Sequence, residues 1–236
     1  MLVALTLKVF ELDRYFVPKE LVVNIAALIV AMMFVARRRV LQFDTADLLL
    51  TFYLAWSAAS LVFASNYWLA QRAFSLSLAS ALIFWAARRA GIGGLQRFLF
   101  IAAASAAVIA AVTSLAQAYG IESEFFTLAR APGGTLGNRN FVAHIVASGL
   151  PVTVWCTVAA RRSLGALVGS AATGLLTVAL ILSRSRAAWL ASIVFVAISI
   201  ILLLASRRYW RGGVVGGRLA RVLLAIATGG LVAFAL

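Results

Sequence analysis

The chain has 236 residues, of which 64% are hydrophobic and only 12% charged, and its mean hydropathy is +1.03. This balance excludes an ordinary soluble domain and, because the alternating ten-residue strands of a barrel are absent, predicts an all-α polytopic helix bundle in a membrane. The formal net charge of +14 does not point to a nucleic-acid partner, because the basic residues stand at the ends of apolar segments, where they orient membrane helices.

Apolar segments of about 20 residues, the length needed to cross a bilayer, follow one another along the chain. Seven are expected to span, and an eighth begins near Leu219; in order, the seven are 21–36, 46–65, 69–87, 98–118, 141–160, 164–183 and 187–206. Residues 1–236 are expected to form a single transmembrane domain. The first apolar run, Met1 to Phe10, is too short to span, and the last segment reaches Leu236 without a polar anchor. The chain is therefore expected to be a piece of a longer protein.

The basic residues between these segments predict the orientation. Thirteen fall on one side, which is therefore predicted to be cytoplasmic, and eight fall on the other side together with five of the seven acids. The second group contains Lys8, Arg14, Lys19, Arg72, Arg130, Arg139, Arg184 and Arg186. The loop 119–140 and the junction at 184–186 are thus both predicted to lie on the outer side of the membrane.

The longest polar loop runs from Arg130 to Asn140, just before the fifth segment. Its glycines permit positive backbone angles and close approach to a bulky ligand; they are Gly133, Gly134 and Gly137. Either Asn138 or Asn140 is expected to cap the following helix, which would direct N-terminal amides toward an anion. The alternative is a capped turn that uses glycines for its own geometry. Arg130 and Arg139 favour anion binding.

A second basic site stands at the junction of the sixth and seventh segments, in Ser183-Arg-Ser-Arg186. Almost no loop separates the two segments, so both guanidinium groups are expected at the membrane face, where charges usually face a partner or a water-filled cavity. The planar fork of arginine suits a diphosphate. Snorkelling to lipid headgroups, with Trp189 at the interface, is the alternative. The two explanations are equally supported for Arg184, whereas binding of a partner is favoured for Arg186.

Other polar residues have simpler explanations. His144 is expected to be a packing or water-contact residue, Pro151 to kink its helix, and Gly165, Gly169 and Thr173 to form a close-packing face. Arg72 is expected either to line the same cavity as the other outward arginines or to snorkel. One histidine and one cysteine do not build a metal site, so no metal or other cofactor is expected.

Three motifs in order resemble the O-antigen ligase and polymerase-like proteins. Gly134-Thr-Leu-Gly-Asn-Arg-Asn140, preceded by Arg130, is similar to their Gly-Thr-Phe-Gly-Asn-Pro-Asn signature. Ser185-Arg-Ala-Ala-Trp-Leu190 resembles their Ser-Arg-Gly-Ala-Trp-Leu, and Asp13-Arg-Tyr-Phe-Val-Pro-Lys19 resembles their Asp-x-Phe-x-x-Pro-Lys. The chain differs from the family pattern at Arg139 and Ala187.

The resemblance implies a glycosyltransferase with a GT-C-like fold that needs no metal. It would move a glycan from undecaprenyl diphosphate to an acceptor, which in the family is a glycan, lipid A core sugar or protein. The resemblance also implies a bacterial inner membrane, with the loop 119–140 on its periplasmic face. Arg186 is then expected to bind the diphosphate, with Arg130, Arg72 and Arg184 as weaker candidates and Asn138 and Asn140 in the adjoining loop. The catalytic histidine of the family would lie beyond residue 236, so this piece alone is expected to be inactive. The alternatives are a transporter of a small anion such as bicarbonate, and a structural subunit whose arginines hold membrane lipids.

Overall fold

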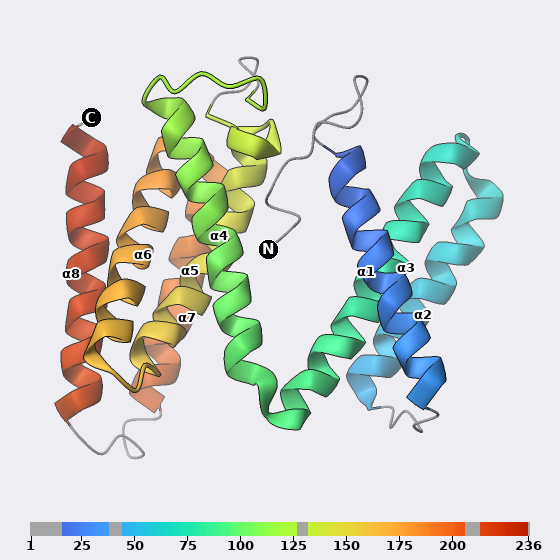
Figure 1. The fold of residues 1–236 in the computed structure, drawn as a ribbon, viewed down its shortest axis with the longest axis horizontal. Coiled ribbons are helices and arrows are strands. Elements are labelled where there is room, and N and C mark those ends of the chain that lie inside the picture. The colour runs from blue at the N-terminus through green and yellow to red at the C-terminus, as the bar shows by residue number, and fades with distance from the viewer. Residues whose placement is uncertain (1–15, 38–43, 127–131, 206–212, 236) are drawn as a thin grey trace. The chain divides into compact units, whose positions relative to one another are not determined.

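The computed structural model describes residues 16–37, 44–126, 132–205 and 213–235. These residues form α-helices joined by short turns, and no strand occurs among them, which confirms the predicted all-α class. The chain packs as two compact units, Phe16–Gln96 and Arg97–Leu236. Figure 1 labels the helices of both.

In the unit Phe16–Gln96, the part of the chain that the structure describes forms three α-helices. They are α1 (Val17–Arg37), α2 (Thr45–Ser60) and α3 (Tyr67–Ala90), with the 3-10 turn η2 (Leu61–Phe63) after α2 and the π-helical turn η3 (Gly91–Leu95) after α3. Helix α1 packs against α3, and the buried apolar residues of the two helices include Ala27, Ala79 and Ala81. Such small side chains let membrane helices approach closely.

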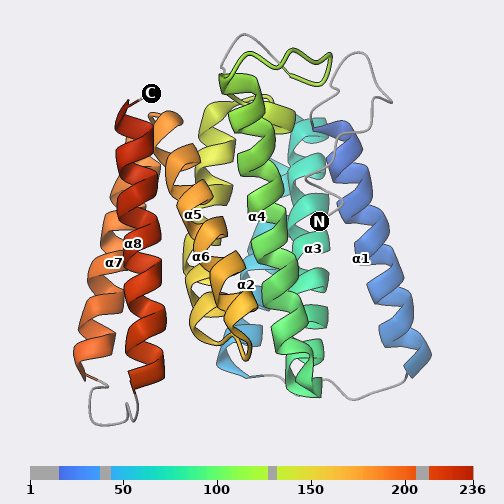
Figure 2. The same cartoon turned by 60° about the vertical axis from the view of Figure 1, so that its left-hand side comes forward.

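The described residues of the unit Arg97–Leu236 form five helices and the 3-10 turn η4 (Gly134–Leu136). The helices are α4 (Gln96–Ala118), α5 (Arg139–Val158), α6 (Ser163–Leu182), α7 (Arg186–Ala205) and α8 (Gly213–Ala235). Helix α6 packs against both α5 and α8 (Figure 2). The largest fully buried side chain of the core is Leu176 of α6, which lies with Val142 and Val146 of α5.

Helices α5 and α6 meet at the predicted close-packing face. A Cβ atom built on Gly169 would lie 2.2 Å from the Thr157 Oγ1 atom, so only glycine fits there. The Thr173 hydroxyl, which is fully buried, donates to the Gly169 carbonyl at 2.9 Å and lies 3.3 Å from the Thr153 hydroxyl. The prediction is therefore confirmed for Gly169 and Thr173, whereas Gly165 is exposed and does not lie in this interface.

We expect Gly169→Val to lower the melting temperature of the detergent-solubilised chain. Inserting methyl groups into a packed interface costs about 1–3 kcal/mol, and here the nearest atoms belong to the opposite helix. Gly217→Val in α8 is the matched control, because a Cβ at Gly217 meets no atom within 4 Å. Both variants carry the same change in helix propensity, so equal melting temperatures would contradict the packing role.

The helices support a multi-pass membrane protein. Within the described ranges, five stretches are long and apolar enough to span: Val17–Phe34, Thr45–Phe63, Tyr67–Ala118, Arg139–Val158 and Ser163–Leu182. The third stretch has 52 residues and contains both α3 and α4, joined through η3. Two shorter apolar stretches, Arg186–Phe195 and Ala220–Ala235, lie within α7 and α8. Each of the eight predicted segments coincides with a helix. The largest difference in a boundary is at α8, which begins at Gly213 and not near Leu219.

Candidate functional site

The glycine-asparagine loop, residues 132–140, is docked on the end of α4. The Gln117 Oε1 atom accepts hydrogen bonds from the amides of Gly133 and Gly134, each at 2.8 Å. The Ser114 hydroxyl donates to the Pro132 carbonyl at 2.9 Å. Gly134, Thr135 and Leu136 are buried. The conformation of this loop is thus held by side chains of α4, a contact that the sequence pattern did not reveal.

The backbone angles and close contacts of the loop require glycine at positions 133, 134 and 137. Gly134 has φ +50°, and a Cβ on it would lie 2.8 Å from the Ser114 amide nitrogen. Gly137 has φ +70°, and a Cβ on Gly133 would lie 2.5 Å from the Asn138 nitrogen. The predicted positive backbone angles are thus confirmed at Gly134 and Gly137, whereas Gly133 has φ −95°. Because Gln117 accepts from two of their amides, these amides are directed at the protein.

Asn138 caps α5, as the sequence predicted for one of the two asparagines. Its side-chain oxygen accepts from the Asn140 amide at 2.9 Å. Arg139 is the first residue of α5, and its side chain is exposed, as is that of Asn140. Arg130, the other arginine predicted for this site, lies outside the described residues. Direct contact of Asn138 or Asn140 with a substrate stays a prediction.

A three-residue turn joins α6 to α7 and is held by two buried serines. The Ser183 hydroxyl donates to the Leu180 carbonyl at 2.6 Å and accepts from the Ser185 amide at 3.3 Å. The indole nitrogen of Trp189, one turn into α7, donates to the same carbonyl at 3.0 Å. The sharpness of the junction was predicted, and these bonds explain it, together with the bond that the Arg184 amide donates to the Ile181 carbonyl at 3.1 Å.

Arg184 and Arg186 project from this turn. Arg184 has φ +53°, the one positive φ among described non-glycine residues, and Arg186 is the first residue of α7; both side chains are exposed. A left-handed arginine is uncommon and costs of order 1–3 kcal/mol of backbone strain, which the hydrogen bonds of the turn offset. Within the described part of the chain, neither guanidinium forms an ion pair.

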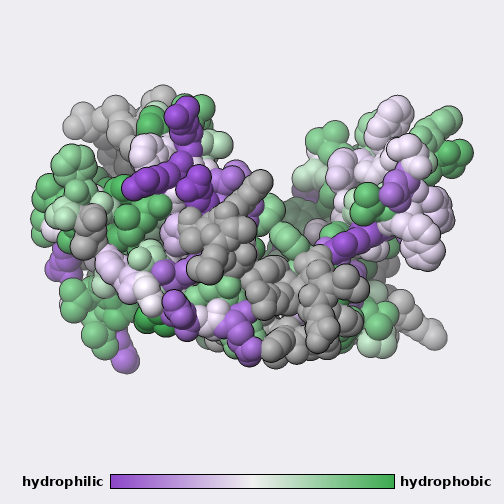
Figure 3. Space-filling model, turned by 90° about the horizontal axis from the view of Figure 1, so that it is seen from above, coloured by the Kyte–Doolittle hydropathy of each residue, from purple (hydrophilic) through white to green (hydrophobic). Residues whose placement is uncertain are grey.

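The docked loop and the turn lie at the same end of the unit Arg97–Leu236 (Figure 1). One apolar cluster connects them, since Leu136 and Ala143 of the loop region belong to it together with Leu180 and Ala188 beside the turn. Seen from above, this end presents hydrophilic side chains next to apolar ones (Figure 3). The structure thus brings Asn138, Asn140 and the arginines 139, 184 and 186 to one end of one unit.

Arg72 belongs to the other unit and has a carboxylate partner. Its Nε and Nη2 atoms donate to the two carboxylate oxygens of Glu20, at 2.7 and 2.8 Å. Sequence reasoning did not foresee this pairing of α3 with α1. The membership of Arg72 in one cluster with Arg186 therefore stays a prediction.

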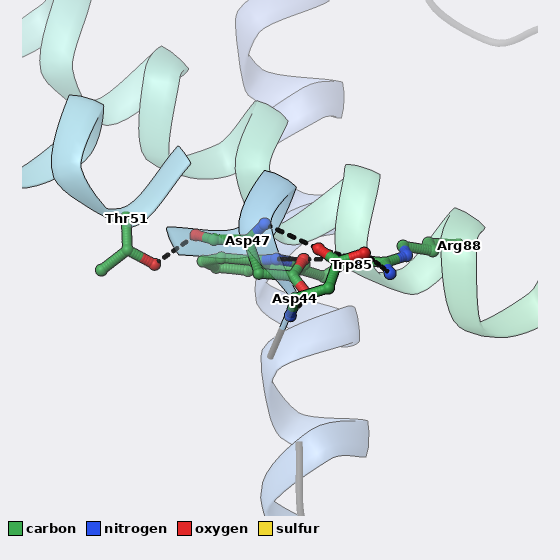
Figure 4. A network of polar contacts seen from close by, with 5 residues as sticks. All are labelled: Asp44, Asp47, Thr51, Trp85 and Arg88. Atoms are coloured by element: carbon green, nitrogen blue, oxygen red, sulfur yellow. Dashed lines mark hydrogen bonds and ion pairs between the residues drawn. The ribbon is translucent and has the colours of Figure 1, made fainter. Parts of the chain in front are cut away.

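A third polar cluster, at the start of α2, was missed altogether (Figure 4). Asp44 and Asp47 form a reciprocal capping box, each carboxylate accepting from the amide of the other at 3.0 Å. Arg88 of α3 forms ion pairs with both carboxylates, and the Trp85 indole nitrogen donates to Asp47 at 2.9 Å. Asp47 is 3% exposed, so these donors compensate a buried charge. The spacing Asp44-x-x-Asp47 indicates the cap; the partner on α3 leaves no signal in the sequence.

We expect the chain to lose stability in acid partly through Asp44. The hydrogen bond from Arg88 holds the pKa of the Asp44 carboxyl below its usual value of 3.8. A carboxyl whose pKa is depressed by folding stabilises the protein above its unfolded pKa, and this contribution is lost as the pH falls through the folded pKa. The melting temperature should therefore drop below about pH 4. Asp44→Asn keeps a capping oxygen but does not titrate, so its drop should be smaller; the same acid profile in both proteins would contradict the assignment.

The described residues hold no group of three His, Cys, Asp or Glu side chains near enough to bind a metal ion. Comparison of the chain with known protein families, with curated proteins and with solved structures finds no match.

Proposed function

We propose that this chain is the donor-binding part of a membrane glycosyltransferase. It would bind a glycan on undecaprenyl diphosphate at the periplasmic face of a bacterial inner membrane, through a bundle of seven or eight spans with a GT-C-like arrangement. The acceptor would be a glycan, lipid A core sugar or protein hydroxyl. The resemblance of the three motifs to O-antigen ligase and polymerase-like proteins supports this proposal. No metal or other cofactor takes part in it.

The observation that carries the proposal is the exposed pair Arg184 and Arg186 on a turn whose backbone is held from within. Ser183 and Trp189 both donate to the Leu180 carbonyl, and Ser183 accepts from the Ser185 amide. The backbone of the turn is thus held by hydrogen bonds, while the two arginines form no ion pair among the described residues. A guanidinium makes two parallel charge-assisted hydrogen bonds to a phosphate and keeps its charge at every relevant pH. The N-terminus of α7 adds a favourable dipole for an anion at Arg186.

The chemistry fits a diphosphate leaving group. As the bond from sugar to diphosphate breaks, negative charge grows on the phosphate oxygens, and a fixed cation at that place stabilises the transition state. The acceptor hydroxyl also needs a base. The proposal assigns only donor binding to this chain, and His144, which is exposed one turn into α5, is not assigned as that base.

The proposal is tested by lipid binding to the purified chain in nanodiscs. Undecaprenyl diphosphate should bind at least about tenfold more tightly than undecaprenol, which has the same tail and no charge, as measured by native mass spectrometry. Equal binding of the two lipids would overturn the proposal. Uptake of bicarbonate by proteoliposomes that contain the chain, without diphosphate binding, would favour the transporter instead.

A further inference from the structure

Aromatic side chains gather at one end of the unit Phe16–Gln96, around the turn from α2 to α3. Phe63 is 89% exposed and Trp68 is 80% exposed, and Trp56, in the last turn of α2, is 69% exposed. Ser65 and Asn66 lie between them at the tip of the turn, and the Asn66 side chain caps α3 by accepting from the Leu69 amide at 3.1 Å. Residues 61–68, here called the aromatic turn, thus combine a polar tip with aromatic flanks.

We propose that the aromatic turn inserts into the headgroup boundary of the bilayer and anchors this end of the unit. Trp and Tyr concentrate at that boundary because they join an apolar ring to a polar group. Full exposure of Phe63 and Trp68 to water would be costly, and the apolar stretch Thr45–Phe63, which ends at this turn, is long enough to cross the bilayer. The polar tip is then left in contact with headgroups and water. This inference does not rest on the proposed glycosyltransferase function.

The same placement explains the ion pair of Arg72. This residue follows Trp68 by four positions in α3, and one helical turn is about 5.4 Å long, so its Cα lies roughly one turn further from the headgroups. An unpaired guanidinium is costly near hydrocarbon. Glu20, from the first turn of α1, supplies both carboxylate oxygens to Arg72 and cancels its charge. We assign the Glu20–Arg72 pair to charge neutralisation at the membrane boundary.

The depth of the turn can be measured with spin labels, because Cys156 is the one cysteine of the sequence. In a Cys156→Ser background, labels are introduced by Phe63→Cys and by Trp68→Cys, and the chain is reconstituted into phosphatidylcholine vesicles. Phe52→Cys, an exposed position in the middle of α2, is the reference for the bilayer interior. Glu122→Cys, in an exposed loop, is the reference for water. Accessibility to oxygen and to a water-soluble nickel chelate reports the depth of each label.

The labels at 63 and 68 should show depth values between those of the two references. Accessibility to the chelate equal to that at 122 would place the turn in water and overturn the proposal. Exclusion of both reagents would show that protein covers the turn, either a second copy or another subunit, and would also overturn it. For the ion pair, Glu20→Gln should lower the melting temperature in vesicles by a few degrees more than Glu122→Gln; equal values would overturn the neutralising role.

Discussion

Arg186→Ala is expected to weaken the binding of undecaprenyl diphosphate by roughly ten- to hundredfold. A hydrogen bond to a charged group contributes about 1.5–3 kcal/mol, and each 1.4 kcal/mol changes an affinity tenfold. Arg186 is exposed at the first position of α7, and the Ser183 hydroxyl accepts from the amide of the preceding Ser185, so alanine should not disturb the fold. Insertion of the variant into the membrane should be unchanged.

Two further variants make this result specific. Arg161→Ala removes an exposed arginine of the same unit from the short connection between α5 and α6, at the opposite end of those helices, and should leave binding unchanged. Arg184→Ala should weaken binding less than Arg186→Ala, because snorkelling to lipid headgroups explains Arg184 as well as diphosphate binding does. Equal losses at 184 and 186 would contradict that ranking, and wild-type binding in Arg186→Ala would remove the diphosphate role altogether.

The helices were predictable because local rules determine them. A run of about 20 apolar residues has no stable alternative to a helix in lipid, and a single side chain determines a cap, as Asn138 does at α5. The close packing at Gly169 was predictable for the same reason, because small residues spaced four apart lie on one face of a helix.

Partners far apart in the sequence were not predictable. Gln117 lies 16 residues before Gly133, Arg88 lies 41 residues after Asp47, and Arg72 lies 52 residues after Glu20. A membrane helix is apolar on all sides, so its hydrophobic pattern does not say which face meets a neighbour or at what register. The arginines of the α6–α7 turn were identified because charges at a membrane face stand out, whereas their geometry, including the positive φ of Arg184, depends on buried serines that look ordinary in the sequence.

Gly134→Ala is expected to release the glycine-asparagine loop from α4. It should lower the melting temperature more than Gly120→Ala or Gly93→Ala. The added Cβ would lie 2.8 Å from the Ser114 nitrogen and 2.9 Å from the Thr113 carbonyl carbon, and backbone atoms of a helix cannot rotate away. Overpacking costs about 1–3 kcal/mol, and the left-handed conformation at φ +50° costs alanine roughly 1–2 kcal/mol more. If the loop undocks, both hydrogen bonds to Gln117 are lost as well.

Two matched glycines separate these effects. Gly120→Ala places the same methyl group at φ +81° where no atom lies within 4 Å, so it should show the conformational cost alone. Gly93→Ala has neither a positive φ nor a neighbour within 4 Å and should be close to neutral. In thermal unfolding of the three variants in one detergent, Gly134→Ala should therefore have the lowest melting temperature, Gly120→Ala an intermediate one and Gly93→Ala the highest. If Gly134→Ala and Gly120→Ala melted together, the loop would not be docked on α4, and the glycines would be free to serve a ligand instead of the packing of the chain.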